Sequence, residues 1–396
     1  MDEIKNLHNL IWKRYIRMPQ GHLLDNADSE GNTILPTKED CEKCLPNPLS
    51  WLTSIENGAF FGGLYLYALV TDYDKNPTEN RKKEIEILAN GLFILCDVGK
   101  TDGFIARGVA NDGISHYPVS SEDQVGPWLL GLWKLYKSTA SDAQMKSKIA
   151  NKISRTVNGI KNCGYQIPTE WENVYRGSYA NDDWRGVCKA LFCGMLIDVF
   201  APNLIGGKEY IRLRDEKPNN SLFTRKEIAS HGFAPDMIKN TGLIQFWIDV
   251  CAHLCLKELS KYDKNSASYY QKGLLSNGEV AIKFCEEYKK YKNAETLSSP
   301  PDWKKLSVSE ECKNPDKMFT LTDAQFKEWK TVFPTYNNEH YFVCNTFSAD
   351  IIAITCGSDV ISKKVQKSLF DALKFINFDT MWYSYGFFGE VAYLLI

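Results

Sequence analysis

The sequence predicts an all-α protein that folds as an (α/α)6 barrel, a toroid of six inner helices surrounded by six outer helices. Apolar segments rich in small residues follow polar turns at intervals along the chain, and more polar segments with helical periodicity lie between them. Long alternations of apolar and polar residues, which would indicate strands, are missing from the sequence. A helix that is apolar nearly all round must be covered by other helices, and a ring of amphipathic helices is the simplest cover.

The expected elements follow one another in pairs. The inner helices are expected at residues 58–72, 123–136, 184–200, 242–256, 345–356 and 385–396, and the outer helices at 4–17, 80–96, 142–160, 225–239, 266–289 and 362–375. The polar residues that start the first four inner segments are separated by 67, 60 and 58 residues, and they are Glu56, Asp123, Asp183 and Thr241. A spacing near sixty residues fits two helices and two loops.

The whole chain, residues 1–396, is expected to form a single catalytic domain, although its length would allow two or three domains. The polar stretch 289–329, which contains the sequence SSPP at 298–301, is interpreted as a long excursion from the barrel. Residues 204–222 are expected to form a loop or a small hairpin.

Charge and hydropathy exclude several classes of partner. With 47 basic and 49 acidic residues the net charge is −2, and there is no basic tract, so we expect neither nucleic acid nor an anionic membrane as a partner. No apolar run reaches eighteen residues, so we expect no membrane span. The first residues lack the pattern of a signal peptide. We therefore expect a cytoplasmic protein, or a periplasmic or secreted one if a signal peptide has been removed; the oligomeric state is not indicated.

No cofactor and no metal are expected. The sequence lacks an HExxH motif, a glycine-rich phosphate loop and a GxSxG elbow. Several of the twelve cysteines lie within apolar segments, where they behave as small hydrophobic residues. Cys41 and Cys44 form a CxxC pair, but no second pair or histidine motif accompanies it, so we assign it no zinc or redox role.

Polar residues precede several inner helices. In such a barrel the inner helices run in the same direction, so their N-terminal ends would gather on one face. The polar residues expected there are Glu56 and Asn57, Glu122, Asp123 and Gln124, Asp182 and Asp183, and Asn345. Helix capping would explain any one of them. Acids that converge on one face, however, raise at least one pKa, which a general acid near neutral pH requires.

Aromatic and basic residues fall in the same loops and first turns. Aromatic rings can line a sugar site, and a guanidinium fork suits a carboxylate. With Asp123 and Glu56 as catalytic candidates, the substrate-binding candidates are Asn57, Arg107, His116, Tyr117, Trp128, Asp183, Trp184 and Arg185. Core packing is the alternative for each aromatic residue, and an ion pair with Asp182 or Asp183 is the alternative for Arg185.

Four stretches resemble the unsaturated glucuronyl and rhamnogalacturonyl hydrolases of the six-hairpin glycosidase superfamily. They are IENGAFFGGLYLYALVTDY (55–73), SSEDQVGPWLLGLWKLY (120–136), DDWRGVCKALFCGML (182–196) and NTFSADIIAI (345–354), and they occur in the order of those enzymes. The resemblance implies that the general acid/base aspartate is Asp123 and that Glu56 stands where the family has a second aspartate. The family's Gln-Ala-Trp after Arg-Gly is replaced by Val187, Cys188 and Lys189, which leaves a saturated uronide or another glycoside open as substrate.

The sequence thus predicts a glycoside hydrolase that acts on a short oligosaccharide containing uronic acid. An inverting mechanism would place the Asp123 and Glu56 carboxyl groups roughly 6.5–9.5 Å apart, against about 5 Å for a retaining pair. A polysaccharide lyase or sugar epimerase is one alternative, and its bases would be Tyr117 and one of the histidines His116, His231 and His340. A non-catalytic carbohydrate-binding toroid is the other, favoured if Asp123 and Glu56 lie in separate salt bridges.

Overall fold

The computed structural model is built almost entirely of helices, and it describes residues 2–202, 207–219, 221–235, 245–297 and 302–396. Within these residues the sheets are two antiparallel ribbons of two strands each. One pairs β1 (Ile16–Arg17) with β2 (His22–Leu23), and the other pairs β3 (Gln166–Pro168) with β4 (Tyr175–Ser178). The all-α class predicted from the sequence is therefore confirmed.

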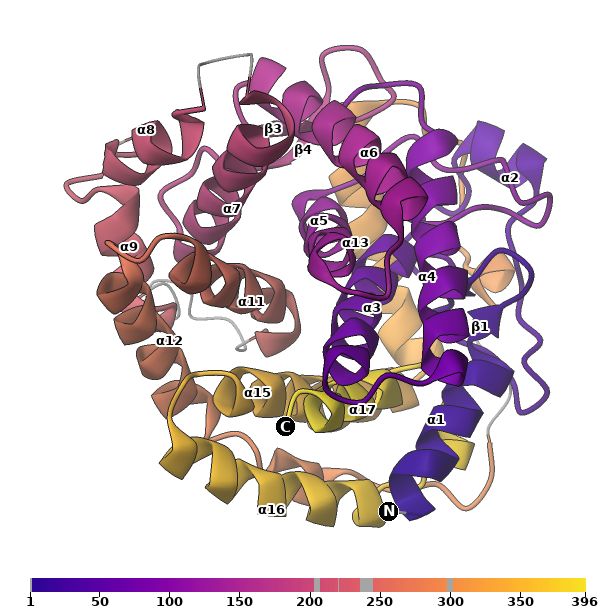
Figure 1. Cartoon of the computed structure of the whole chain (residues 1–396). Helices are drawn as coiled ribbons and strands as arrows, with labels where there is room; N and C mark the ends of the chain where they lie inside the picture. The colour runs from indigo at the N-terminus through magenta and orange to yellow at the C-terminus, as the bar shows by residue number, and fades with distance from the viewer. Residues whose placement is uncertain (1, 203–206, 220, 236–244, 298–301) are drawn as a thin grey trace.

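The apolar segments form helices that are buried nearly all round and lie in the middle of Figure 1. They are α3 (Gly58–Lys75), α5 (Glu122–Lys137), α7 (Trp184–Phe200), α11 (Phe246–Tyr262), α15 (Asn345–Ile354) and α17 (Gly386–Leu394). The bounds of α3, α5, α7, α15 and α17 agree with the expected segments to within about three residues, whereas α11 continues to Tyr262, beyond the expected end at residue 256. The start of the fourth segment, residues 242–244, and Thr241 before it lie outside the described residues.

Amphipathic helices cover the buried ones from outside (Figure 1). They are α1 (Asp2–Arg14), α4 (Glu79–Asp97), α6 (Ala143–Asn162), α9 (Arg225–His231), α12 (Ala267–Ala281) and α16 (Asp359–Phe375). The helix expected at 266–289 is shorter than predicted, because α12 ends at Ala281 and a turn leads to the 3-10 helix η2 (Glu287–Lys290). Of the expected helix at 225–239, residues 236–239 lie outside the described residues.

The two stretches expected to be irregular contain helices. Helix α8 (Glu209–Asp215) lies within the stretch 204–222, so the expectation of a loop or hairpin there was wrong. Residues 204–206 and 220 of this stretch are not described. The excursion 289–329 contains η3 (Trp303–Lys305) and most of α13 (Pro315–Val332). The polar sequence of α13 did not indicate a helix. Short elements complete the chain: α2 (Lys38–Lys43), α14 (Thr335–Glu339), the π-turn η4 (His340–Cys344) and η5 (Phe378–Thr380).

Helices α3 and α5 lie side by side with their N-terminal ends together, as expected. The Gln124 side chain accepts a hydrogen bond from the Phe60 N–H (3.1 Å) and donates one to the Asn57 side chain (3.0 Å), so the first turns are in register. Further along, a Cβ on Gly63 would lie 2.2 Å from the Pro127 carbonyl oxygen. A glycine at position 63 therefore lets the two backbones touch, which fixes the spacing of the residues that precede them.

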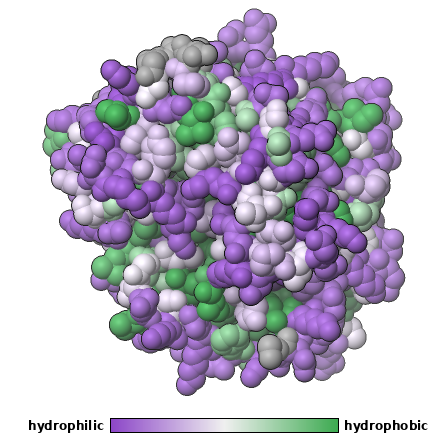
Figure 2. Space-filling model, viewed as in Figure 1, coloured by the Kyte–Doolittle hydropathy of each residue, from purple (hydrophilic) through white to green (hydrophobic). Residues whose placement is uncertain are grey.

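The face seen in Figure 2 is mostly hydrophilic, with scattered hydrophobic residues between polar ones. Within the described residues, no helix is long and apolar enough to cross a bilayer.

A buried ionic cluster fastens the first helix to the rest of the molecule. The His8 ring on α1 lies 2.7 Å from Glu390 of α17 and 3.1 Å from Glu84 of α4. Tyr65 of α3 donates a hydrogen bond to the same Glu390 (2.8 Å). Burial acts to lower the pKa of His8, but the two carboxylates outweigh it and raise this pKa to about 9. The charged imidazolium therefore holds α1 against two helices distant in sequence.

We predict that this cluster makes stability depend on pH above neutrality. Because folding raises the pKa of His8 from 6.5 to about 9, its contribution is full below pH 6.5 and is lost as pH rises through about 9. The contribution is on the order of 2–3 kcal/mol. In denaturant titrations at pH 6 and pH 10, the wild type should exceed His8→Gln at pH 6 and lose most of that advantage at pH 10. A pH-independent difference would contradict the account.

Candidate functional site

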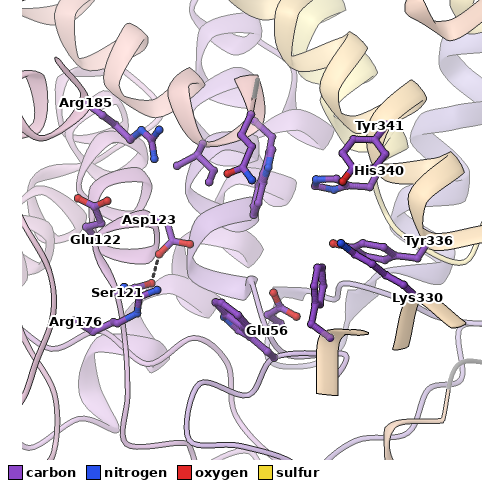
Figure 3. A pocket seen from close by; sticks show the side chains of 15 residues that line it. Glu56, Ser121, Glu122, Asp123, Arg176, Arg185, Lys330, Tyr336, His340 and Tyr341 are labelled. Atoms are coloured by element: carbon purple, nitrogen blue, oxygen red, sulfur yellow. Dashed lines mark hydrogen bonds between the residues drawn. The ribbon is translucent and has the colours of Figure 1, made fainter. Parts of the chain in front are cut away.

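A cavity of about 360 Å³ opens at the N-terminal ends of α3, α5 and α7. Carboxylates, cations and aromatic rings line it together (Figure 3). The lining residues are Trp51, Glu56, Ser121, Glu122, Asp123, Arg176, Arg185, Gln245, Trp247, Ile248, Phe326, Lys330, Tyr336, His340 and Tyr341. Both predicted catalytic residues are among them.

Asp123 stands in the first turn of α5, as the sequence predicts. Ser121 is the N-cap residue, yet its hydroxyl donates to the Asp123 carboxylate instead of capping the helix. Pro127 lies four residues further on and has no N–H, so the Asp123 carbonyl receives no ordinary helical hydrogen bond from that position. The Asp123 side chain is 21% exposed and faces the cavity.

Glu56 is supplied by the loop before α3. Its carboxylate accepts a hydrogen bond from the Leu52 N–H (2.7 Å), and Leu52 has a φ of 75°, a left-handed conformation that a leucine adopts at a cost. The side chain of Asn47 supports this loop, since it accepts from the Trp51 N–H (3.1 Å) and donates to Gln325 of α13 (2.8 Å). The loop thus presents Glu56 and Trp51 to the same cavity.

A buried arginine lies behind the two carboxylates. Arg107 is 3% exposed and donates to the Glu56 carbonyl oxygen (3.1 Å) and to the Ser121 hydroxyl (2.7 Å). One terminal nitrogen lies 3.9 Å from the Asp123 carboxylate. Arg107 therefore supports the two carboxylates from behind. It does not line the cavity, as a substrate-binding residue would.

The two carboxyl groups have pKa values displaced in opposite directions. Burial acts to raise the pKa of Asp123, but Arg107, the Ser121 hydroxyl, Lys189 and Arg176 together lower it. Burial raises the pKa of Glu56, and the charge of Asp123 adds to this rise, against the Leu52 N–H and Arg107. The sequence pointed to Asp123 as the proton donor. The directions of the two pKa shifts favour the reverse order, in which Glu56 keeps its proton to higher pH than Asp123 does.

Asp25 is a further carboxyl group behind Glu56 that the sequence pattern does not single out. It is 2% exposed and accepts hydrogen bonds from the Asn57 backbone (2.8 Å) and side chain (2.6 Å). Burial and the charge of Glu56 raise the pKa of Asp25 well above its ordinary value. Asn57, a substrate-binding candidate, is occupied by Asp25 and Gln124 and is not among the cavity-lining residues.

Among the described residues, three cations line the cavity: Arg176, Arg185 and Lys330. The Arg185 Nε donates to Asp249 of α11 at 3.0 Å, so the expected ion pair exists with a different partner from Asp182 or Asp183. Its guanidinium group points into the cavity in Figure 3. Arg176, in β4, has its guanidinium over the Phe319 ring of α13 at 4.9 Å.

The wall opposite Asp123 comes from parts of the chain that the sequence does not assign to the site. Phe326 and Lys330 belong to α13, Tyr336 to α14, and His340 and Tyr341 to η4. Among these only His340 is a sequence candidate, as a base of the alternative lyase or epimerase. The cluster of aromatic residues after position 325 could have indicated that this segment contributes to a binding site. Nothing in the polar excursion, however, indicated that these residues lie beside α3 and α5.

The other predicted binding residues lie away from this cavity. His116 lines a separate cavity of about 450 Å³, and the hydroxyl of Tyr117 donates to the Leu45 carbonyl. Trp128 and Trp184 are buried, with indole N–H groups that donate to Leu92 (2.8 Å) and Ala229 (3.2 Å). These rings are core residues because they stand within helices that are apolar all round.

Asp183 is a helix cap in this structure. Its side chain accepts a hydrogen bond from the Gly186 N–H at 2.8 Å at the start of α7, and it does not line the cavity. The capping alternative thus accounts for Asp183, whereas Asp123, in the first turn of α5, makes no such bond.

The cysteine pair is buried and reduced. Cys41 and Cys44 are free thiols, and burial raises the pKa of both, that of Cys44 to about 12. Within the described part of the chain, no group of three or more His, Cys, Asp or Glu side chains is placed to hold a metal ion.

Comparison with family models, curated proteins and solved structures found no match to this chain. What the cavity can do is therefore inferred from its own residues.

Proposed function

We propose that the protein is a glycoside hydrolase of the (α/α)6-barrel type, a single domain that cleaves a short oligosaccharide containing uronic acid. The observation that carries the proposal is the pair Glu56 and Asp123, which line one cavity and have pKa values displaced in opposite directions. Two carboxyl groups whose environments separate their pKa values are the usual acid and base of glycoside hydrolysis.

In this proposal Glu56 is the general acid and Asp123 the general base. Glu56 gives its proton to the glycosidic oxygen as the bond to the anomeric carbon breaks. Asp123 accepts a proton from a water molecule, whose oxygen forms the new bond to that carbon. The inverting form of this reaction needs carboxyl groups roughly 6.5–9.5 Å apart. This separation remains a prediction. Membership of the six-hairpin superfamily, which the resemblance suggests, also remains a prediction.

The cavity offers a suitable setting for an anionic sugar. Arg185 and Arg176 present guanidinium groups beside the carboxylate pair, and Lys330 adds an ammonium group on the opposite wall (Figure 3). A guanidinium fork can bind a carboxylate through two charge-assisted hydrogen bonds. Trp51, Trp247 and Phe326 supply aromatic walls that can cover the apolar faces of a sugar ring.

A lyase or epimerase is the second candidate, and the position of His340 favours it. His340 and Tyr336 line the cavity together, where the base of a lyase or epimerase would have to stand, but burial lowers the pKa of His340 to about 4 and so weakens its imidazole as a proton acceptor. His116, His231 and Tyr117, the other bases considered, do not line this cavity. A lyase would leave a carbon–carbon double bond in its product, which ultraviolet absorbance detects and hydrolysis does not produce.

The non-catalytic alternative required Asp123 and Glu56 to lie in separate salt bridges. Asp123 has Arg107 at 3.9 Å, a long contact, and the Glu56 carboxylate accepts from a backbone N–H. That arrangement does not favour a purely structural pair.

We predict that Asp123→Asn and Glu56→Gln each fold near normally yet lose at least about a hundredfold in turnover, because general acid–base catalysis is typically worth about 10²–10⁴-fold. Turnover of an aryl glucuronide, tested as both anomers, is measured beside a melting curve. Asp183→Asn is the matched control, since asparagine still caps α7 and the residue does not line the cavity. Near-normal turnover by Asp123→Asn would refute the catalytic role of Asp123 and make Glu122 the next catalytic candidate.

We also predict that Arg185 distinguishes charged from neutral substrates. Arg185→Gln should lower kcat/KM for a glucuronide by about 10- to 100-fold and change that for the matched glucoside much less, because a charge-assisted hydrogen bond is lost. Since this change leaves Asp249 without its ion-pair partner, the double variant Arg185→Gln/Asp249→Asn controls for the buried charge. Equal effects on both substrates would contradict a role for Arg185 in binding a uronate.

A further inference from the structure

The imidazole of His340 stands in the cavity wall with unused hydrogen-bonding capacity. It begins the π-turn η4, which joins α14 to α15, and the residue is 7% exposed. Such π-turns occur frequently at functional sites. Its Nδ1 atom is buried and has no hydrogen-bond partner among the described residues. A buried polar group in this state calls for an explanation.

Aromatic rings fix the orientation of this imidazole. Tyr336 stacks on it with centroids 5.4 Å apart and planes at 8°, and Trp247 packs edge-on at 5.4 Å and 83°. Tyr385 and Tyr341 close two further sides at 5.6 Å and 5.4 Å. A ring enclosed in this way cannot swing toward another partner, so its polar atoms keep their directions.

The ring nitrogen that points into the cavity is Nε2. Figure 3 shows a nitrogen of His340 directed at the cavity, and Nδ1 is the buried one. An N–H group buried without an acceptor is rarer and more costly than an unpaired acceptor. The neutral ring should therefore carry its proton on Nε2 and leave a bare lone pair on Nδ1.

Burial, with a smaller effect from a neighbouring cation, keeps the ring neutral. Lys330 on α13 lies on the same wall of the cavity, and burial together with this ammonium group lowers the pKa of His340 to about 4. Glu56, on the cavity wall, is the carboxylate on the α3 side. The neighbouring Glu339 is turned toward the backbone N–H groups of Trp382 and Tyr383 (3.2 and 2.9 Å).

We propose that His340 is a substrate-binding residue whose Nε2–H donates a hydrogen bond to a hydroxyl oxygen of the bound sugar. The inference rests on the proposed function in one respect, that this cavity binds a sugar. An uncharged donor complements Arg176 and Arg185. The two arginines bind the carboxylate of a uronate, whereas His340 donates to a hydroxyl that charged and neutral sugars share. Its contribution is therefore the same for a uronate and its neutral counterpart and does not change between pH 5 and 8.

The first test needs no substrate. In protein labelled with ¹⁵N-histidine, the His340 signals, assigned by their loss in His340→Phe, should show a protonated Nε2 and an unprotonated Nδ1 from pH 5 to 8. A proton on Nδ1, or a titration midpoint near the ordinary histidine value, would overturn the proposal.

The second test measures binding of D-glucuronate and D-glucose to three forms of the protein. His340→Phe keeps a ring in the aromatic enclosure and removes the donor, so it should weaken both sugars by the same factor, about 3- to 10-fold. His340→Gln retains an amide N–H and should weaken both less. Binding of both sugars by His340→Phe as tight as by the wild type would overturn this proposal alone. Failure of the wild type to bind either sugar would instead refute the proposed function, and the ¹⁵N measurement would still decide the state of His340.

Discussion

The buried guanidinium of Arg107 connects the segments that form the cavity. It donates to the Glu56 carbonyl oxygen in the loop before α3 and to the Ser121 hydroxyl at the start of α5, while the Arg107 carbonyl accepts from the Ala59 N–H at 3.1 Å. A charge that is 3% exposed is costly unless such partners surround it. The two helix starts and the intervening loop are therefore held together by one group, and the close contact of α3 and α5 at Gly63 sets their spacing.

The same charge acts to lower the pKa values of both acids, yet these pKa values are displaced in opposite directions. Asp123 has Arg107 and the Ser121 hydroxyl beside its carboxylate, which favour the ionised form over the effect of burial. Arg107 also acts to lower the pKa of Glu56, but its hydrogen bond goes to the Glu56 carbonyl oxygen, and burial together with the charge of Asp123 raises this pKa. One cavity thus holds a carboxyl group with a raised pKa and another with a lowered pKa, as the proposed pair of acid and base requires. The opposite wall, from α13, α14 and η4, supplies the aromatic rings and His340 without altering that division.

The sequence predicted the helices better than the site. Long apolar segments indicated α3, α5 and α7 nearly residue by residue, because a strongly apolar helix leaves little choice of structure. It also placed Glu56 and Asp123 at the same cavity, since Glu56 lies just before α3 and Asp123 in the first turn of α5. It failed for α13, whose polar surface resembles a loop, and for Trp128 and Trp184, where an aromatic residue in an apolar helix looks the same whether it packs in the core or faces a ligand. The partner of Arg185, Asp249, is 64 residues away and could not be identified from local pattern. The directions of the pKa shifts could not be predicted from the sequence either, because they depend on Arg107 lying behind both acids.

The most direct test of this account is a carboxyl ¹³C titration of the wild-type protein, with Glu56 and Asp123 assigned through Glu56→Gln and Asp123→Asn. The account predicts that Glu56 releases its proton above the ordinary glutamate value of 4.5 and that Asp123 does so below the ordinary aspartate value of 3.8. If Asp123 instead kept its proton to higher pH than Glu56, the assignment of acid and base would be contradicted, and with it the role of Arg107 and Ser121 in holding Asp123 ionised.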